Sequence, residues 1–142
     1  MTEPMAPGTL DLRVRFSETD ANGHVSHLSY LIYCEDARTR LMQHPAIGYS
    51  WPRDRYNLVL VAQSIRYHQP AYFPDELHVE TAVTRVGRSS LGLTHTITRP
   101  RDDVLIAESE CTLVLVDVRT NHSTPWPDAI RTRLTAHETA HG

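Results

Sequence analysis

The most reactive side chains of the sequence gather in one short stretch near the amino terminus. Asp20, His24 and His27 lie close together there, and Glu18 and Asn22 lie beside them. A carboxylate can act as a nucleophile or as a general base, and a neighbouring imidazole can orient it or carry a proton. Aspartate and asparagine also shape turns routinely. The spacing alone favours a turn, so catalysis at Asp20 depends on how the neighbouring elements are placed.

A strand precedes this stretch and a helix follows it. Alternating apolar residues predict the strand over 10–16, and apolar steps of three and four predict the helix over 26–44. Ser26 suits the N-cap of this helix, and Pro45 ends it. The first turn of a helix presents unpaired N–H groups and the positive end of the dipole, so it stabilises anions and developing oxyanions. A carboxylate at Asp20 would face that positive end.

The chain after Leu58 has the pattern of strands separated by turns. We expect strands over 58–67, 77–83, 91–97 and 104–118, with residues 121–127 closing the ordered part. Four strands at hairpin spacing follow the helix. Strands and helices do not alternate along the chain, as they would in a parallel sheet. The sequence therefore predicts an α+β domain in which an antiparallel sheet wraps around one long helix. The length suits a single domain over 1–142, with 1–8 and about 135–142 expected to be loose.

Composition excludes several classes of protein. The net charge is -3, which argues against nucleic-acid binding, and no apolar run is long enough to span a membrane. All 14 basic residues are Arg, so a lysine Schiff base is excluded. Cys34 and Cys111 lie in apolar segments outside any metal or redox motif, which predicts buried free thiols. With no export signal at the amino terminus, we expect a cytoplasmic protein without membrane partners.

Two patterns resemble metal sites. His137, Glu138 and His141 fit H-E-x-x-H, but no third ligand follows them in the sequence, so we do not expect a zinc protease. Asp20 with His24 and His27 could form a carboxylate and imidazole site, which stays open as a lesser alternative. We expect no metal and no cofactor.

Several blocks of the sequence resemble a known family. The stretch from Arg15 to Val25, followed by Tyr30 and residues 35–39, is similar to the opening of the 4-hydroxybenzoyl-CoA thioesterase type of hotdog-fold acyl-CoA thioesterases. Further blocks resemble the same family in the same order over roughly 10–134: Tyr67–Pro70, Asp75–Val79, Val86–Ser90 and Leu113–Asp117. One departure is Ser26-His27, where many relatives have two asparagines.

The resemblance implies a curved antiparallel sheet around the helix, and homodimers or homotetramers with active sites at the subunit interface. It places the catalytic acid on Asp20, with His24 and His27 beside it, and the thioester carbonyl at the N–H groups near His27. The substrate-binding positions that it implies are Gly23, Val25, Tyr30, Arg85, Arg88 and Ser89. The resemblance implies that Arg85 and Arg88 contact the coenzyme A phosphates. The alternative is that they are simply exposed arginines at a turn.

Thioester hydrolysis is therefore the leading hypothesis. Asp20 would act as a nucleophile, giving a mixed anhydride, or as a general base for water. A thiol with a pKa of about 8 to 9 leaves without a strong general acid. We expect the acyl pocket to be formed by Tyr30, Leu31, the loop around Trp51 and the partner's strands, and the thioester can belong to coenzyme A or to a carrier protein. An acyl-thioester hydratase or dehydratase, and a non-catalytic acyl-CoA-binding protein, stay open as alternatives.

Overall fold

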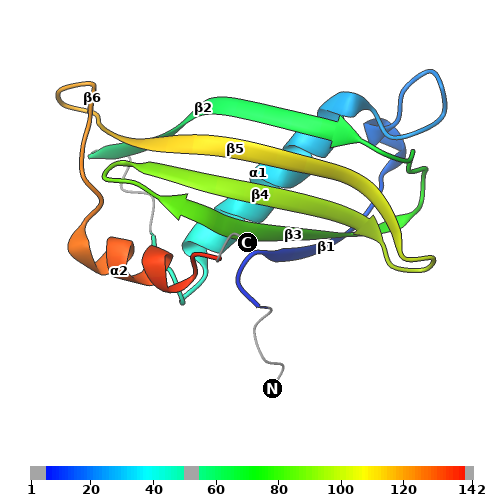
Figure 1. Cartoon of the computed structure of the whole chain (residues 1–142). Coiled ribbons are helices and arrows are strands. Elements are labelled where there is room, and N and C mark those ends of the chain that lie inside the picture. Colours follow the sequence, from blue (N-terminus) through cyan, green and yellow to red (C-terminus); the bar gives the residue numbers. More distant parts are fainter. Residues whose placement is uncertain (1–5, 50–54, 140–142) are drawn as a thin grey trace.

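The computed structural model describes residues 6–49 and 55–139. In it, one long helix lies across one face of an antiparallel sheet, and a short second helix packs near one end (Figure 1). The elements in chain order are β1 (Thr9–Arg13), the 3-10 turn η1 (Phe16–Glu18), α1 (His27–Gln43), β2 (Tyr56–Tyr67), β3 (Glu76–Val86), β4 (Ser90–Arg99), β5 (Val104–Asp117), β6 (His122–Ser123) and α2 (Asp128–Ala136). The α+β arrangement expected from the sequence is confirmed.

The sheet has the order β1-β3-β4-β5-β2, and β6 pairs with the end of β5. Strands β1 and β2 are therefore the edges of this path, and every pairing in it is antiparallel. At one end of the sheet β1 and β2 finish, β3 begins and β4 finishes (Figure 1). The turn between β3 and β4 lies at the other end. Because α1 begins at the first of these ends, the stretch between β1 and α1 is held there.

Helix α1 forms where the sequence predicts it, because its apolar face meets the sheet. Ser26 is the N-cap and its Oγ accepts from the Leu28 N–H at 3.3 Å. The first half of the helix packs against the middle strands through Tyr30, Cys34 and Ala37, all buried. The second half packs through Leu41 and Met42 into a second cluster that includes Trp126 and Leu134. Burying one large aliphatic side chain contributes about 1.5 to 3 kcal/mol, so this face holds the helix in place.

Two elements differ from the expectation. The first strand ends at Arg13, because the Arg15 N–H turns to the Glu18 carboxylate at 2.7 Å and starts the 3-10 turn. The ordered chain continues past residue 127 into α2, which packs on the second cluster through the buried Leu134 and the partly buried Ile130. The expected looseness of 1–8 and about 135–142 falls partly outside the described residues. None of the helices in the described ranges combines the length and the apolar character needed to cross a bilayer.

A polar group lies between the two apolar clusters, on the face of β4 that meets α1. His95 is 1% exposed; its Nδ1 lies 2.8 Å from Thr81 Oγ1 and its Nε2 lies 3.7 Å from Cys111 Sγ. Burial, with the nearby Arg38 guanidinium adding repulsion, lowers the pKa of His95 to about 4. Cys34 and Cys111 are buried free thiols, as the sequence predicts, and burial raises the pKa of both.

His95 makes the stability of the fold depend on pH. Its pKa is lower in the folded chain than the unfolded value of about 6.5, so the unfolded chain binds more protons between these values. The stabilisation is present above pH 6.5, and about 3 kcal/mol of it is lost as the pH falls to about 4. Urea unfolding of wild type and His95→Gln at a series of pH values, at one protein concentration, measures this difference. Identical slopes for the two proteins between pH 6.5 and 4 would contradict it.

Candidate active site

A cleft of about 320 Å³ opens beside the start of α1 and the loop that joins β2 to β3. Its lining residues are Asp20, His24, Val25, His27, Tyr30, Tyr67, His68, Gln69 and Pro70. A larger hollow of about 540 Å³ lies among strand residues such as Gly92 and Thr112, with no residue of the 18–27 stretch in its lining. The Asp20 carboxylate and the imidazoles of His24 and His27 therefore come together in the smaller cleft.

Asp20 both shapes its loop and presents a carboxylate to the cleft. Its Oδ1 accepts from the Asn22 N–H at 2.8 Å, and its main chain bonds to Gly23 and His24 at 3.0 Å each. Gly23 has φ +84°, the left-handed region that glycine adopts most readily, and this closes the turn. His24 Nδ1 lies 3.9 Å from Asp20 Oδ1, beyond hydrogen-bond distance. In the described part of the chain no partner is recorded for Oδ2, which leaves it open to a ligand.

The start of α1 presents an unpaired backbone donor at the same cleft. Ser26 caps Leu28, and the Ser29 N–H bonds to the Ser26 carbonyl at 2.9 Å. For the His27 N–H no acceptor is recorded among residues 6–49 and 55–139. Tyr67 fixes this first turn, because its hydroxyl donates to the His27 carbonyl at 3.1 Å. An unpaired N–H at the positive end of a helix can bind an oxyanion.

Glu18, the other acid of the stretch, does not line the cleft. Its Oε1 accepts from the Arg15 N–H at 2.7 Å and from the Tyr33 hydroxyl at 3.0 Å. Burial and this hydrogen bond raise the pKa of Tyr33 strongly, so its hydroxyl stays protonated and keeps donating. The main-chain carbonyl of Glu18 accepts from the Ser26 N–H at 2.8 Å and from the Ser29 hydroxyl at 2.9 Å. Glu18 therefore ties the loop to the helix, and Asp20 is the acid that faces the cleft.

Tyr30 forms the deep wall of the cleft. It is 4% exposed, and its ring packs against Tyr67 with centroids 5.5 Å apart. Its hydroxyl oxygen accepts from the Ala71 N–H at 3.2 Å. Burial raises the pKa of Tyr30, so the hydroxyl keeps its proton. The cleft lining thus includes Val25 and Tyr30 with the three residues expected to be catalytic, whereas Gly23 lies in the adjoining turn and does not line the cleft.

The end of β2 and the loop that follows it supply cleft residues that were not expected to belong to the site. Tyr67, His68, Gln69 and Pro70 line the cleft, and His68 Nε2 lies 3.2 Å from Glu108 Oε2. The signal was present, because Tyr67–Pro70 is one of the blocks that resemble the thioesterases. Nothing in the local pattern showed that the end of β2 meets the start of α1, since that contact joins residues about forty positions apart.

Other expected residues lie elsewhere. Arg85 is in the last part of β3, and Arg88 and Ser89 are in the turn that joins β3 to β4. This turn lies at the opposite end of the sheet from the start of α1 (Figure 1). Leu31 is half-buried outside the cleft lining, and Trp51 falls outside the described residues.

The metal patterns find no support in the described residues. His137 Nδ1 lies 2.9 Å from the Arg133 carbonyl, and Glu138 accepts from the Val86 N–H at 3.3 Å. His141, the last member of the H-E-x-x-H pattern, lies outside the described residues. Across 6–49 and 55–139 no group of three or more His, Cys, Asp and Glu side chains is placed to hold a metal ion.

Comparison with solved structures identifies the fold as the hotdog fold. A 1,4-dihydroxy-2-naphthoyl-CoA thioesterase from Synechocystis superposes with a TM-score of 0.81 at 21% identity, over 89% of this chain and 94% of that one. The SAV2348 protein from Staphylococcus aureus, solved in complex with CoA, superposes with a TM-score of 0.85 at 18% identity, over 99% of this chain and 92% of that one. The curved sheet around α1 is thus shared with both of these proteins.

Comparison of sequences gives the family. Residues 14–134 match the model of the thioesterase-like superfamily. The acyl-CoA thioester hydrolase YbgC of Escherichia coli is 32% identical over 107 residues, which cover 75% of this chain and 79% of the relative. The chain belongs to the thioesterase-like superfamily, and the resemblance expected from its sequence blocks is confirmed. It is accordingly a hydrolase of the thioesterase class.

Proposed function

We propose that the protein hydrolyses an acyl-CoA thioester to a carboxylic acid and free coenzyme A at the cleft beside Asp20. The observation that carries this proposal is that the Asp20 carboxylate and the unpaired His27 N–H line one cleft. The first supplies a nucleophile or base, and the second supplies an oxyanion-binding donor. The similarity to an acyl-CoA thioester hydrolase of Escherichia coli supports the choice of substrate.

In the proposed reaction the thioester carbonyl oxygen accepts from the His27 N–H, which makes the carbonyl carbon more electrophilic. Asp20 then attacks that carbon, the C–S bond breaks, and the thiolate leaves and takes up a proton. Water hydrolyses the resulting mixed anhydride, which releases the acid and restores the carboxylate. In the alternative route Asp20 removes a proton from water, and the hydroxide attacks the same carbon. Both routes consume one water and need no metal or cofactor.

The neighbouring residues have supporting roles in this proposal. His24 lies close enough to Asp20 for a small movement of its ring to bring it into hydrogen-bond distance of the carboxylate or of a bound water. Its ring packs edge-on against Tyr72, with centroids 6.1 Å apart. His27 supplies its backbone N–H, and its imidazole lines the entrance. Gly23 and Val25 shape the loop, and Tyr30 contacts the acyl group. The two buried free thiols fit the reducing cytoplasm, where we place the protein.

A second subunit completes the proposed site. Strand β2 is a twelve-residue edge strand on which Val59, Leu60 and Val61 are 39, 41 and 56% exposed. A long apolar edge of this kind pairs readily with another strand, so we propose a homodimer, alone or within a tetramer, in which β2 pairs antiparallel with its own copy. That pairing places the β3–β4 turn of one subunit beside the end of the other subunit that carries the cleft. The turn lies three strand spacings, or about 14 Å, from β2 of its own subunit. Arg85 and Arg88 of the partner subunit could then reach the coenzyme A phosphates.

A hydrolysis screen tests the proposal. We expect the protein to release free thiol from at least one member of a panel of short, long, branched and aromatic acyl-CoAs, followed with a thiol reagent. Acyl carrier protein thioesters in the same panel distinguish the two thiol carriers. The imidazoles of His24, His27 and His68 in the cleft favour a hydratase as the second candidate, so enoyl-CoAs are included. Loss of the enoyl absorbance without thiol release, or saturable binding without turnover, would overturn the proposal.

A further inference from the structure

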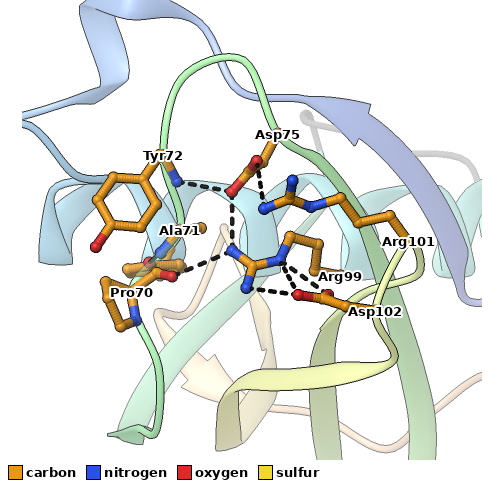
Figure 2. Close-up of polar contacts among 8 residues, drawn as sticks. Pro70, Ala71, Tyr72, Asp75, Arg99, Arg101 and Asp102 are labelled. Atoms are coloured by element: carbon orange, nitrogen blue, oxygen red, sulfur yellow. Dashed lines mark hydrogen bonds and ion pairs between the residues drawn. The ribbon is translucent and has the colours of Figure 1, made fainter.

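A network of charged side chains joins the end of β4 to the loop between β2 and β3 (Figure 2). Arg99 ends β4, and its side chain is 11% exposed. Its Nε donates to both carboxylate oxygens of Asp102 at 3.0 and 3.2 Å, and its Nη2 donates to one of them at 3.0 Å. These hydrogen bonds lower the pKa of Asp102 and raise that of Arg99, so both groups stay charged. The pairing with Asp102 therefore fixes the position of the Arg99 guanidinium at the end of β4.

The remaining nitrogen of the Arg99 guanidinium, Nη1, donates hydrogen bonds to the β2–β3 loop at two places. Nη1 donates to Asp75 Oδ2 at 3.0 Å and to the Pro70 carbonyl at 3.4 Å, as Figure 2 shows. Asp75 Oδ2 also accepts from the Tyr72 N–H at 3.0 Å, and the Asp75 side chain is only 10% exposed. Arg101 lies 3.5 Å from the other Asp75 oxygen, but it is 66% exposed and has no recorded contact with Pro70 in the described chain. Arg99 is therefore the cation that joins the two ends of the loop.

The residues between those two places hold both sides of the cleft. The Ala71 carbonyl accepts from the Val25 N–H at 2.8 Å, and the Ala71 N–H donates to the Tyr30 hydroxyl at 3.2 Å. Tyr72 pairs with His24 as an isolated antiparallel bridge. Pro70 itself lines the cleft. One guanidinium on β4 thus fixes a loop whose backbone bonds the Asp20–Val25 turn on one side and the Tyr30 wall on the other.

Stability alone is a weak reason for such an arrangement. A largely buried ion pair contributes little net stability, because desolvation of both charges offsets their attraction. A site, in contrast, needs its groups held within about half an ångström, and a displacement of about 1 Å can lower a rate about a hundredfold. The hydrogen bonds of the network fix the loop beside the cleft, where a rigid arrangement matters for a site.

We propose that Arg99 is a positioning residue of the active site, which acts through Pro70 and Asp75 to hold Val25 and Tyr30 about the Asp20 cleft. This inference rests on the thioesterase function proposed above. Arg99 does not touch the reacting atoms, so its removal changes how well the cleft is assembled and leaves the chemistry of Asp20 itself unaltered.

Steady-state kinetics on the best substrate of the panel test the proposal. Arg99→Gln is expected to lower kcat by about tenfold or more, with KM changed less than about threefold. Arg99→Lys is expected to restore part of the rate, because one ammonium can pair with Asp75 but cannot also hold Asp102 in a bidentate pair. Arg101→Gln is the matched control: it makes the same chemical change beside the same carboxylate, and we expect wild-type kinetics.

Amide hydrogen exchange separates positioning from general stabilisation. In Arg99→Gln the amides of Val25 and Ala71 are expected to exchange about tenfold faster or more, while the Leu93 amide in the middle of β4 keeps its wild-type rate. Wild-type kcat in a folded Arg99→Gln protein, or exchange that accelerates equally at all three amides, would overturn the proposal. If the wild-type protein itself releases no thiol, the proposed function fails, and the exchange experiment still tests the role of Arg99.

Discussion

Replacing Asp20 by asparagine is expected to lower kcat by about a hundredfold or more, equivalent to about 2.7 kcal/mol of transition-state stabilisation, while the fold survives. The amide keeps the shape of the side chain, and its oxygen can still accept from the Asn22 N–H, which holds the turn. It is a poor nucleophile and cannot take a proton from water, so both proposed routes lose their reacting group. Initial rates of thiol release under saturating substrate measure the effect, and circular dichroism checks the fold.

Glu18→Gln is the matched control for this variant. It neutralises an acid two positions away, and the amide oxygen can still accept from Arg15 and Tyr33. Since Glu18 does not line the cleft, kcat is expected to stay within about threefold of wild type. Equal losses in both variants would show that the stretch acts only through its charge. Near-normal turnover in a folded Asp20→Asn protein would remove Asp20 from the mechanism.

A charge in the middle of β2 is expected to convert the proposed homodimer to monomers and to lower kcat/KM by about a hundredfold. Val61 is 56% exposed at the register shift of this edge strand. If β2 pairs antiparallel with its own copy, Val61→Lys places two like charges close to the symmetry axis, which strongly disfavours pairing. The partner's Arg85 and Arg88 then no longer reach the cleft. Light scattering after size exclusion measures the mass, and the thiol assay measures the rate.

Val61→Thr controls for the change of side chain, because threonine keeps the branched shape and the strand preference without a charge. It is expected to stay oligomeric and active. A monomeric wild-type protein with full activity would contradict the interface proposed for β2. A fully active monomer of Val61→Lys would show that each cleft works without a partner.

The helix and the strands could be predicted because their signals are local. Ser26, Pro45 and the apolar steps between them mark α1 within one residue of its observed bounds, and turns separate the later strands clearly. Helix α2 could not be predicted in this way, because it is short and only Ile130 and Leu134 attach it to a cluster that distant parts of the chain form.

In the candidate site, too, the local part could be predicted from the sequence and the part formed by distant residues could not. Asp20, Gly23 and His24 stand in one continuous turn, so their proximity can be predicted from the sequence. Another part of the lining comes from Tyr67–Pro70, which only the tertiary fold brings near, and the Arg99 network that holds this loop joins residues far apart in the chain. Whether Arg85 and Arg88 reach a cleft depends on the proposed pairing of two subunits, which no pattern within one chain specifies.

The most direct test of the proposed function is a crystal structure of Asp20→Asn with an intact acyl-CoA from the panel. The thioester carbonyl oxygen is predicted to lie within about 3.2 Å of the His27 backbone nitrogen, with residue 20 beside the carbonyl carbon. The coenzyme A is predicted to run toward the β3–β4 turn of the partner subunit. An acyl-CoA bound to the outer hollow near Gly92 and Thr112, with the cleft at Asp20 empty, would contradict the account.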